Sequence, residues 1–359
     1  MTIFTPCYCS REDVKRAPDF QSTAYDNVQI DRVIQNVARN IEGHLHRTFY
    51  PNDTTKYFDW PAQSGQGGGF ITYPWKIYFD GNDCVTLTEL QSPPGTDIDI
   101  AYVNLEPANY GPPYTYLELQ RDKNAAFGGA ATPQRAIVAT GTWGYTADND
   151  VVTSLAVAVS SDTATTIQVA NAASTGVGDL LIVDSERMLV QEAAAVTTGD
   201  SQQNSGCSTA ASNDNVLTLT SGSSVNLNEV ILLDAEKMLV LDITGNNVTV
   251  KRQYDGTVLA THSSATVYAY RTLTVARGQL GTSAATHLIS ASVSKHRVPS
   301  LIQSLAIAES VNTILQETGG YSSPQGETGA QISGLGTALA DLWDEAVTTF
   351  GRKSRMRTV

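Results

Sequence analysis

The chain has 359 residues, of which 41% are hydrophobic and 16% charged, and its 36 acidic and 23 basic side chains give a formal net charge of −13. Affinity for the phosphate backbone of nucleic acids depends on Lys and Arg, so this composition excludes a protein drawn to DNA by its net charge. Charged residues usually make up about a quarter of a chain, so the low content suits a surface that neighbouring subunits cover. No apolar run approaches the roughly 18 residues of a membrane-spanning helix.

Two helices are predicted at the N-terminal end. Ser10-Arg11-Glu12-Asp13 has the Ser-x-x-acid form of a capping box and opens a short helix that Pro18 ends. From residue 26 to about residue 48, apolar residues recur in steps of three and four, which predicts a helix of about six turns. Its apolar stripe consists of Ile30, Val33, Ile34, Val37, Ile41 and Leu45.

The stretch 51–147 has a different character. Aromatic residues crowd together between Gly and Pro, and apolar and polar residues alternate at 85–88, 114–119 and 136–145. Alternation with a period of two is typical of strands, and the intervening Gly and Pro residues favour turns. We expect an antiparallel β region here.

The stretch 148–295 contains two internal repeats in an unusual order. Residues 182–190 match residues 232–240, and residues 248–262 match residues 273–287. The half-motifs therefore follow the order A, A, B, B. This order predicts a small β module (155–196 plus 271–295) that is interrupted by a second copy (213–269), with 197–213 as a linker; insertion into an exposed loop is the tolerated kind. A single larger sheet with swapped halves is the alternative.

The repeats also carry charged side chains at equivalent positions: Asp184 and Glu186 with Asp234 and Glu236, Arg252 with Arg277, and His262 with His287. Residues two apart on a strand share a face, so we expect each acidic pair to lie side by side and to form partly exposed ion pairs with the arginines. Each histidine follows Gly-Thr at a fixed spacing, which favours a turn side chain bonded to nearby backbone; a metal or ligand site is the alternative. We predict no catalytic, cofactor or metal site, because no known motif for one occurs.

Helices are predicted again after Pro299, in the stretch 296–350, and their apolar stripes are wider than a surface helix needs. Wide apolar coverage indicates contact on more than one side. The predicted core or oligomer-interface residues are Ile30, Val33, Val37, Ile41, Leu301, Leu305, Val311, Leu315, Leu342 and Trp343. The tail 351–359 is basic, and Arg352, Lys353, Arg355 and Arg357 are predicted to contact an acidic partner or DNA, with a solvated tail as the alternative.

Several segments resemble one known family. They are Cys9-Ser10-Arg11-Glu12-Asp13-Val14-Lys15, Arg47-Thr48-Phe49-Tyr50-Pro51, Tyr57-Phe58-Asp59-Trp60-Pro61, Thr140-Gly141-Thr142-Trp143-Gly144-Tyr145 and the helix that follows Val298-Pro299. In this order they resemble the head–tail connector (adaptor) proteins of long-tailed bacteriophages, over residues 1–61, 135–147 and 296–350. The repeated modules resemble a small β unit that recurs in phage structural proteins.

The resemblance implies an α+β fold. A helical core made of the N-terminal part (1–50) and the C-terminal helices (296–350) would carry the antiparallel β region (51–147), the nested β modules (148–295) and the basic tail (351–359). It implies a virion structural protein without enzymatic activity or cofactor, at the head–tail interface of a particle assembled in the host cytoplasm. The expected partners are further copies in a ring of about twelve, the portal protein, the next tail-side connector (stopper or tail terminator) and DNA, which passes through the channel without sequence-specific binding; no membrane is involved.

Two other functions fit parts of the sequence. A tail-associated host-surface or glycan-binding protein would use the β modules and exposed aromatic residues. A hydrolase hidden in the β region is the third hypothesis. Copy number in purified particles separates the adaptor from both.

Overall fold

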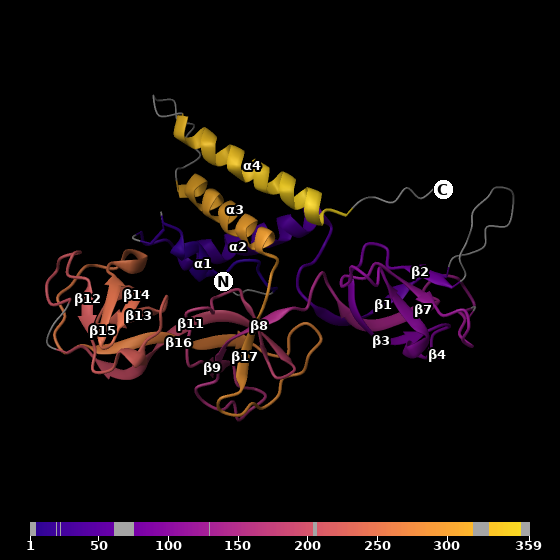
Figure 1. Ribbon diagram of the computed structural model, residues 1–359, viewed down its shortest axis with the longest axis horizontal. Coiled ribbons are helices and arrows are strands. Elements are labelled where there is room, and N and C mark those ends of the chain that lie inside the picture. The colour runs from indigo at the N-terminus through magenta and orange to yellow at the C-terminus, as the bar shows by residue number, and fades with distance from the viewer. Residues whose placement is uncertain are drawn as a thin grey trace. The chain divides into compact units, whose positions relative to one another are not determined.

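The computed structural model describes residues 5–18, 20, 21, 23–60, 75–128, 130–203, 207–318 and 330–352, with the backbone alone for residues 330–337. Within these ranges the chain forms seventeen β-strands in three sheets and four α-helices (Figure 1). The prediction of a fold built on a helical core is therefore wrong, because most of the regular structure is antiparallel β and two apolar cores form between strands. The Ala-, Thr- and Ser-rich stretches give a weak periodic signal in the sequence, yet they pair into long ladders.

The chain divides into two compact units. Unit 1 holds residues 1–41 and 149–344, and unit 2 holds residues 42–148 and 345–359. Two helices contribute residues to both units: α2 (Asn27–Leu45) and α4 (Ala330–Phe350). The division into five parts expected from the sequence stays a prediction.

Unit 2 contains two small sheets around an aromatic core. One sheet has the order β1 (Asn52–Phe58), β7 (Ile137–Trp143), β3 (Cys84–Gln91), β4 (Asp97–Ile98); the other has the order β2 (Lys76–Tyr78), β6 (Tyr116–Leu119), β5 (Val103–Glu106), and the 3-10 turn η1 (Ile100–Tyr102) precedes β5. Alternation along β7 buries the Trp143 ring, which lies 5.8 Å from the Phe58 ring and 5.1 Å from the Phe79 ring between centroids. Gly141 is required in β7, because a Cβ atom there would lie 2.1 Å from the Thr86 carbonyl oxygen.

The helices of unit 1 follow from their caps and stripes. The capping box predicted for α1 (Arg11–Arg16) is confirmed: Ser10 Oγ accepts from the Asp13 amide, and Asp13 accepts from the Ser10 amide. The long helix predicted from residue 26 is confirmed as α2, and its stripe is buried. Helix α3 (Ser300–Thr318) lies against the N-terminal segment, where Cys9 Sγ is 3.8 Å from Ser310 Oγ.

A ten-stranded sheet makes up the rest of unit 1. Its path is β12 (Val216–Thr218), β15 (Asn247–Lys251), β14 (Glu236–Thr244), β13 (Val230–Leu233), β16 (Thr266–Ala276), β11 (Glu186–Ser201), β10 (Leu180–Val183), β17 (Ser292–His296), β8 (Asn149–Ser154), and β9 (Thr166–Gln168) pairs with β16. Two short 3-10 turns, η2 (Gly222–Ser224) and η3 (Tyr254–Gly256), belong to the second copy of the repeat.

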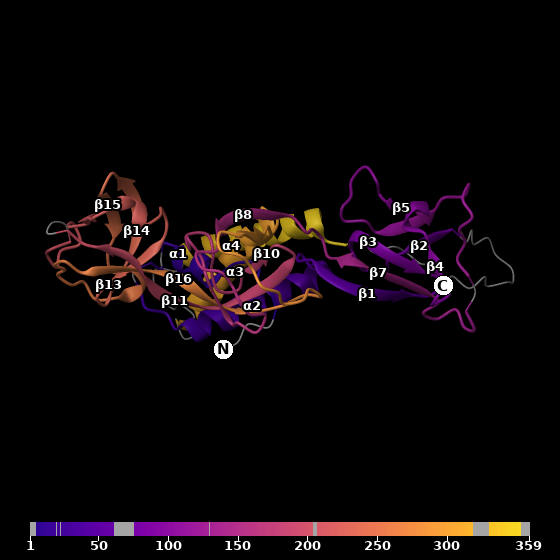
Figure 2. The ribbon, with the colours of Figure 1, turned by 90° about the horizontal axis from the view of Figure 1, so that it is seen from below.

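Two long strands connect the copies of the repeat. β11 and β16 run side by side, from the pair Leu189–Ala276 to the pair Ser201–Thr266 (Figures 1 and 2). The expected linker 197–213 is therefore partly wrong, because its first five residues continue β11. The Thr and Ser side chains of these five residues stay partly exposed, so burial does not mark them as a strand in the sequence. They extend β11 because β16 supplies the backbone hydrogen bonds.

Candidate functional site

The repeated carboxylates lie at a tight turn in each copy. Asp184 follows β10 and Asp234 follows β13, both with positive φ (52° and 51°), which short polar side chains tolerate in hairpin turns. The aspartate side chains are exposed (64% and 63%), whereas those of Glu186 and Glu236 are buried (1% and 0%). The expectation that each pair lies side by side on a strand is therefore wrong, because the first member belongs to the turn.

Each buried glutamate binds the arginine of the matching half-motif. Arg277 Nε and Nη2 donate to Glu186 Oε1 and Oε2 at 2.6 and 2.7 Å, and Arg252 donates to Glu236 at 3.1 and 2.7 Å. The expected arginine–carboxylate pairing is confirmed. The pairs are buried rather than partly exposed, with at most 7% of any of the four side chains accessible.

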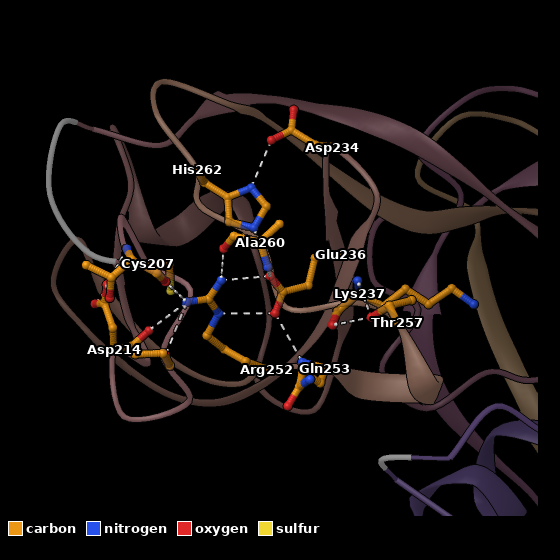
Figure 3. Close-up of polar contacts among 12 residues, drawn as sticks. Cys207, Asp214, Asp234, Glu236, Lys237, Arg252, Gln253, Thr257, Ala260 and His262 are labelled. Carbon is orange, nitrogen blue, oxygen red and sulfur yellow. Dashed lines mark hydrogen bonds and ion pairs between the residues drawn. The ribbon is translucent and has the colours of Figure 1, made fainter.

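The histidines bridge the two carboxylates of each copy, instead of bonding to backbone as expected. His262 Nδ1 lies 2.8 Å from Asp234 Oδ2, and its Nε2 lies 3.0 Å from Glu236 Oε2 (Figure 3). In the other copy His287 lies 2.7 Å from Asp184 and 2.9 Å from Glu186. Each imidazole therefore lies within hydrogen-bond distance of both carboxylates of its own copy.

The side-chain pairing is nested. The first acidic motif (Asp184, Glu186) binds the last basic motif (Arg277, His287), and the second acidic motif binds the first basic one. Each network therefore closes its own copy of the repeat, and the inner network lies within the chain segment that the outer one encloses.

The glutamates of both networks are saturated with donors. Glu186 also accepts from the Gly278 and Ala285 amides, and Glu236 from the amides of the equivalent residues. Burial alone would raise the pKa of Glu186, but the hydrogen bonds from Arg277, His287 and these amides outweigh it and lower the pKa to about 2. The same causes lower the pKa of Glu236.

This geometry suits a structural role for Glu186 and Glu236 and leaves these two carboxylates little capacity to act as general bases. A general base needs a free acceptor within reach of a substrate proton, and these carboxylates already accept from arginine, histidine and backbone. Among the described residues, no group of three or more His, Cys, Asp or Glu side chains could hold a metal ion.

The repeat also forms two ion pairs that were not predicted, each with a buried carboxylate. Asp179 binds Lys295 at 2.8 Å, and Glu229, at the equivalent position of the inner copy, binds Arg271 at 2.7 Å. The repeat carries a signal for them, since an acidic residue recurs at an offset of fifty. The cations differ between the copies, so their pairing could not be read from the repeat.

The predicted interface residues separate into two groups. Ile30, Val33, Val37, Ile41 and Leu305 are at most 2% exposed and belong to the apolar core of the folded chain. Leu301, Val311, Leu315, Leu342 and Trp343 are only half-buried. The second group is the part of the predicted interface that retains apolar surface.

Of the four predicted tail contacts, only Arg352 lies within the described residues. It lines a polar cavity of about 240 Å³ in unit 2, binds Asp83 at 3.0 Å and donates from Nε to the His46 carbonyl at 2.8 Å. Burial raises the pKa of Asp83, against the opposing effect of Arg47 and Arg352. Lys353, Arg355 and Arg357 fall outside the described residues.

Comparison of the chain with protein-family models, with curated proteins and with solved structures finds no significant match. Across the described ranges, none of the helices combines the length and the apolar character that crossing a membrane requires.

Proposed function

We propose that this chain is a structural subunit of a tailed-bacteriophage particle, the adaptor that forms a ring of about twelve copies between head and tail. One observation carries the proposal: the segments that resemble adaptor proteins lie together inside each unit, although the long insertion separates them in the sequence. In unit 1, the N-terminal segment contacts α3 through Cys9 and Ser310, and Gln29 and Arg32 of α2 both bind Glu317 of α3.

The same holds within unit 2. There β1 pairs with β7 along its whole length, from Asn52–Trp143 to Phe58–Ile137. The Phe49 ring contacts the Tyr145 ring at 5.3 Å and the Phe350 ring at 5.5 Å between centroids. Three stretches of sequence that share a resemblance thus contribute to one core.

The ends of the inserted stretch also support the proposal. β8 pairs with β17, so that Asn149 lies opposite His296. Neighbouring ends are what an insertion into a surface loop of a shorter protein requires. The insertion then adds the β modules without separating the segments on either side.

As an adaptor the chain would contact the portal, the next tail-side connector and further copies of itself, and would line the path of DNA without reading its sequence. It would reside in the virion after assembly in the host cytoplasm, with no membrane, cofactor or catalytic step. The half-buried apolar residues of α3 and α4 would form part of the contact between copies.

The test combines copy number with assembly. Quantitative mass spectrometry of purified particles should find about a dozen copies, and native mass spectrometry of the full chain should find a closed ring. Leu315→Asp should block the ring and leave a folded monomer, because it places a charge in an apolar contact. The control Val28→Asp changes an exposed apolar residue of α2 and should assemble normally. Absence of the chain from particles would overturn the proposal.

The second candidate is a tail-associated glycan-binding protein, favoured by exposed aromatic rings in unit 2. Tyr110 is 85% and Tyr57 is 58% exposed, and such rings stack on sugars. Binding to a glycan array that Tyr110→Ala abolishes, with monomers or trimers in solution and low copy number in particles, would favour this candidate.

A further inference from the structure

Lys15 of α1 is a buried amine with two different carbonyl-bearing neighbours. The residue is 8% exposed, and its Nζ lies 2.6 Å from Asn27 Oδ1, at the first residue of α2. The same Nζ lies 2.7 and 2.8 Å from the two carboxylate oxygens of Asp255. All three side chains line a cavity of about 90 Å³ in unit 1.

The turn that carries Asp255 is fixed from several directions. Asp255 has a φ of 56°, its backbone amide donates to the Gln21 carbonyl at 2.9 Å, and its carboxylate also binds Lys237 at 2.5 Å. These contacts hold the carboxylate on the amine of Lys15. An amine, a primary amide and a carboxylate are thereby held together, with the amine buried and the other two groups partly buried.

We propose that Lys15 and Asn27 become joined by an intramolecular isopeptide bond, with Asp255 as the carrier of the transferred proton. Asp255 takes one proton from the Lys15 ammonium, and the neutral Nζ attacks Asn27 Cγ. The second proton of the attacking nitrogen passes to Asn27 Nδ2, the Cγ–Nδ2 bond breaks, and ammonia leaves. Ammonia then takes the proton from Asp255, which restores the carboxylate and releases ammonium; the reaction needs no oxidant, reductant or further reactant.

The electrostatics favour the reactive form of the amine. Burial lowers the pKa of Lys15 most strongly, and although Asp255 opposes this, the nearby Lys237 adds to it, so that the pKa lies below its ordinary value. A lowered pKa increases the fraction of neutral amine, which is the nucleophilic form. Because the two groups are already in contact, the reaction avoids the entropy cost of a bimolecular encounter. That cost is a large part of the barrier to such reactions.

The chain contains its own comparison. Lys251 Nζ donates to Gln21 Oε1, so an amine again meets a primary amide. Among the described residues, however, no carboxylate binds Lys251 to carry the proton. We expect this second amine–amide contact to stay a hydrogen bond.

The test is the intact mass of the purified full chain. The expected mass is lower than that of the sequence by one ammonia, and protease digestion should yield one branched peptide that joins Lys15 to Asn27, with no cleavage after Lys15. No branched peptide should join Lys251 to Gln21. A full sequence mass, with linear peptides on both sides, overturns the proposal without the need for any variant.

Two variants separate the crosslink from a known side reaction. Asn27 cyclising onto its own backbone also loses ammonia, but that product would persist in Lys15→Arg, whereas the crosslink would disappear and the full mass return. Asp255→Asn keeps the amine and the amide and should slow or abolish the crosslink. Ammonia loss that is equal in wild type and Lys15→Arg counts against the proposal.

Discussion

Arg277 and Glu186 are 91 residues apart in the sequence and form a two-point ion pair, with N–O distances of 2.6 and 2.7 Å. Their side chains are 7% and 1% exposed. Arg277→Met would leave Glu186 buried without its cation, and breaking such a pair costs about 3–5 kcal/mol. We expect a loss of this size in the opening free energy of β10 and β11, measured by amide hydrogen exchange.

The matched control for this prediction is Arg297→Met. Arg297 binds Asp150 at 3.4 Å, but both side chains are more than half exposed. Exposed pairs contribute little, so the change should stay within about 0.5 kcal/mol. Equal effects of the two substitutions would show that the buried network does not stabilise the module.

One of the positive-φ positions at which the two copies of the repeat differ is the turn after the arginine. Gly278 of the outer copy has a φ of 57°, and the equivalent residue of the inner copy, Gln253, has a φ of 56°. A side chain in this region costs about 1 kcal/mol that glycine avoids. Gln253→Gly should therefore stabilise the inner copy by about 0.5–1 kcal/mol in a denaturation experiment.

The reciprocal substitution Gly278→Gln should destabilise by more than this. Its Cβ would lie 3.0 Å from the Ala284 amide nitrogen and 3.2 Å from the Thr282 carbonyl oxygen. Gln279→Gly is the control for Gln253→Gly, because Gln279 does not have a positive φ. It should destabilise the protein, since glycine gains more chain entropy on unfolding and the hydrogen bond from Gln279 Nε2 to the Arg277 carbonyl is lost. A destabilised Gln253→Gly would mean that strain at this turn is negligible.

The stability contributed by Glu12 should depend on pH with the opposite sign to that contributed by Glu186 and Glu236. Burial raises the pKa of Glu12 to about 6 from an ordinary value of 4.5, although Arg11 and the Val177 amide oppose the shift. The folded protein therefore keeps a proton that the unfolded chain releases, so this contribution to stability is lost as pH rises from about 4.5 to about 6. Glu186, with its lowered pKa, contributes stability that is lost as pH falls from 4.5 towards about 2.

Glu12→Gln isolates the first effect. The difference in unfolding free energy between the variant and the wild type should change by up to about 2 kcal/mol across that interval and be constant above it. Urea denaturation at a series of pH values measures it. A difference that does not vary with pH would mean that Glu12 titrates normally in the folded protein.

The sequence predicted that the repeated arginines pair with the repeated carboxylates, but neither the contacts of the histidines nor the geometry of the network. Recurrence of Glu186 and Arg277 as Glu236 and Arg252 indicates the partners, since equivalent positions make equivalent contacts. The asymmetry between Asp184 and Glu186 could not be predicted, because it depends on a two-residue turn whose position only the strand pairing defines.

The overestimate of helical structure has a related cause. Amphipathic helices such as α2 give a strong period in the sequence, because one face is buried and the other exposed. The outer part of β11 is half-exposed along its length and gives no such period; its partner β16 defines it as a strand. Long-range pairing of this kind leaves little trace in local sequence.

The basic tail divides into Arg352, which binds residues of its own chain, and three residues with a predicted external partner. Arg352 binds Asp83 and the His46 carbonyl, so Arg352→Met should destabilise unit 2 by about 1–3 kcal/mol, the range for an unsatisfied buried polar group.

The triple substitution of Lys353, Arg355 and Arg357 by Ser should leave the stability of unit 2 unchanged. It should instead weaken attachment to the portal or to duplex DNA at low salt, with the difference fading as salt rises, because ions screen such attraction beyond about 8–10 Å at physiological strength. Binding of wild type and triple variant to purified heads and to DNA, measured across salt concentrations, checks this. Equal binding at every salt concentration would leave these three residues with no role in attachment.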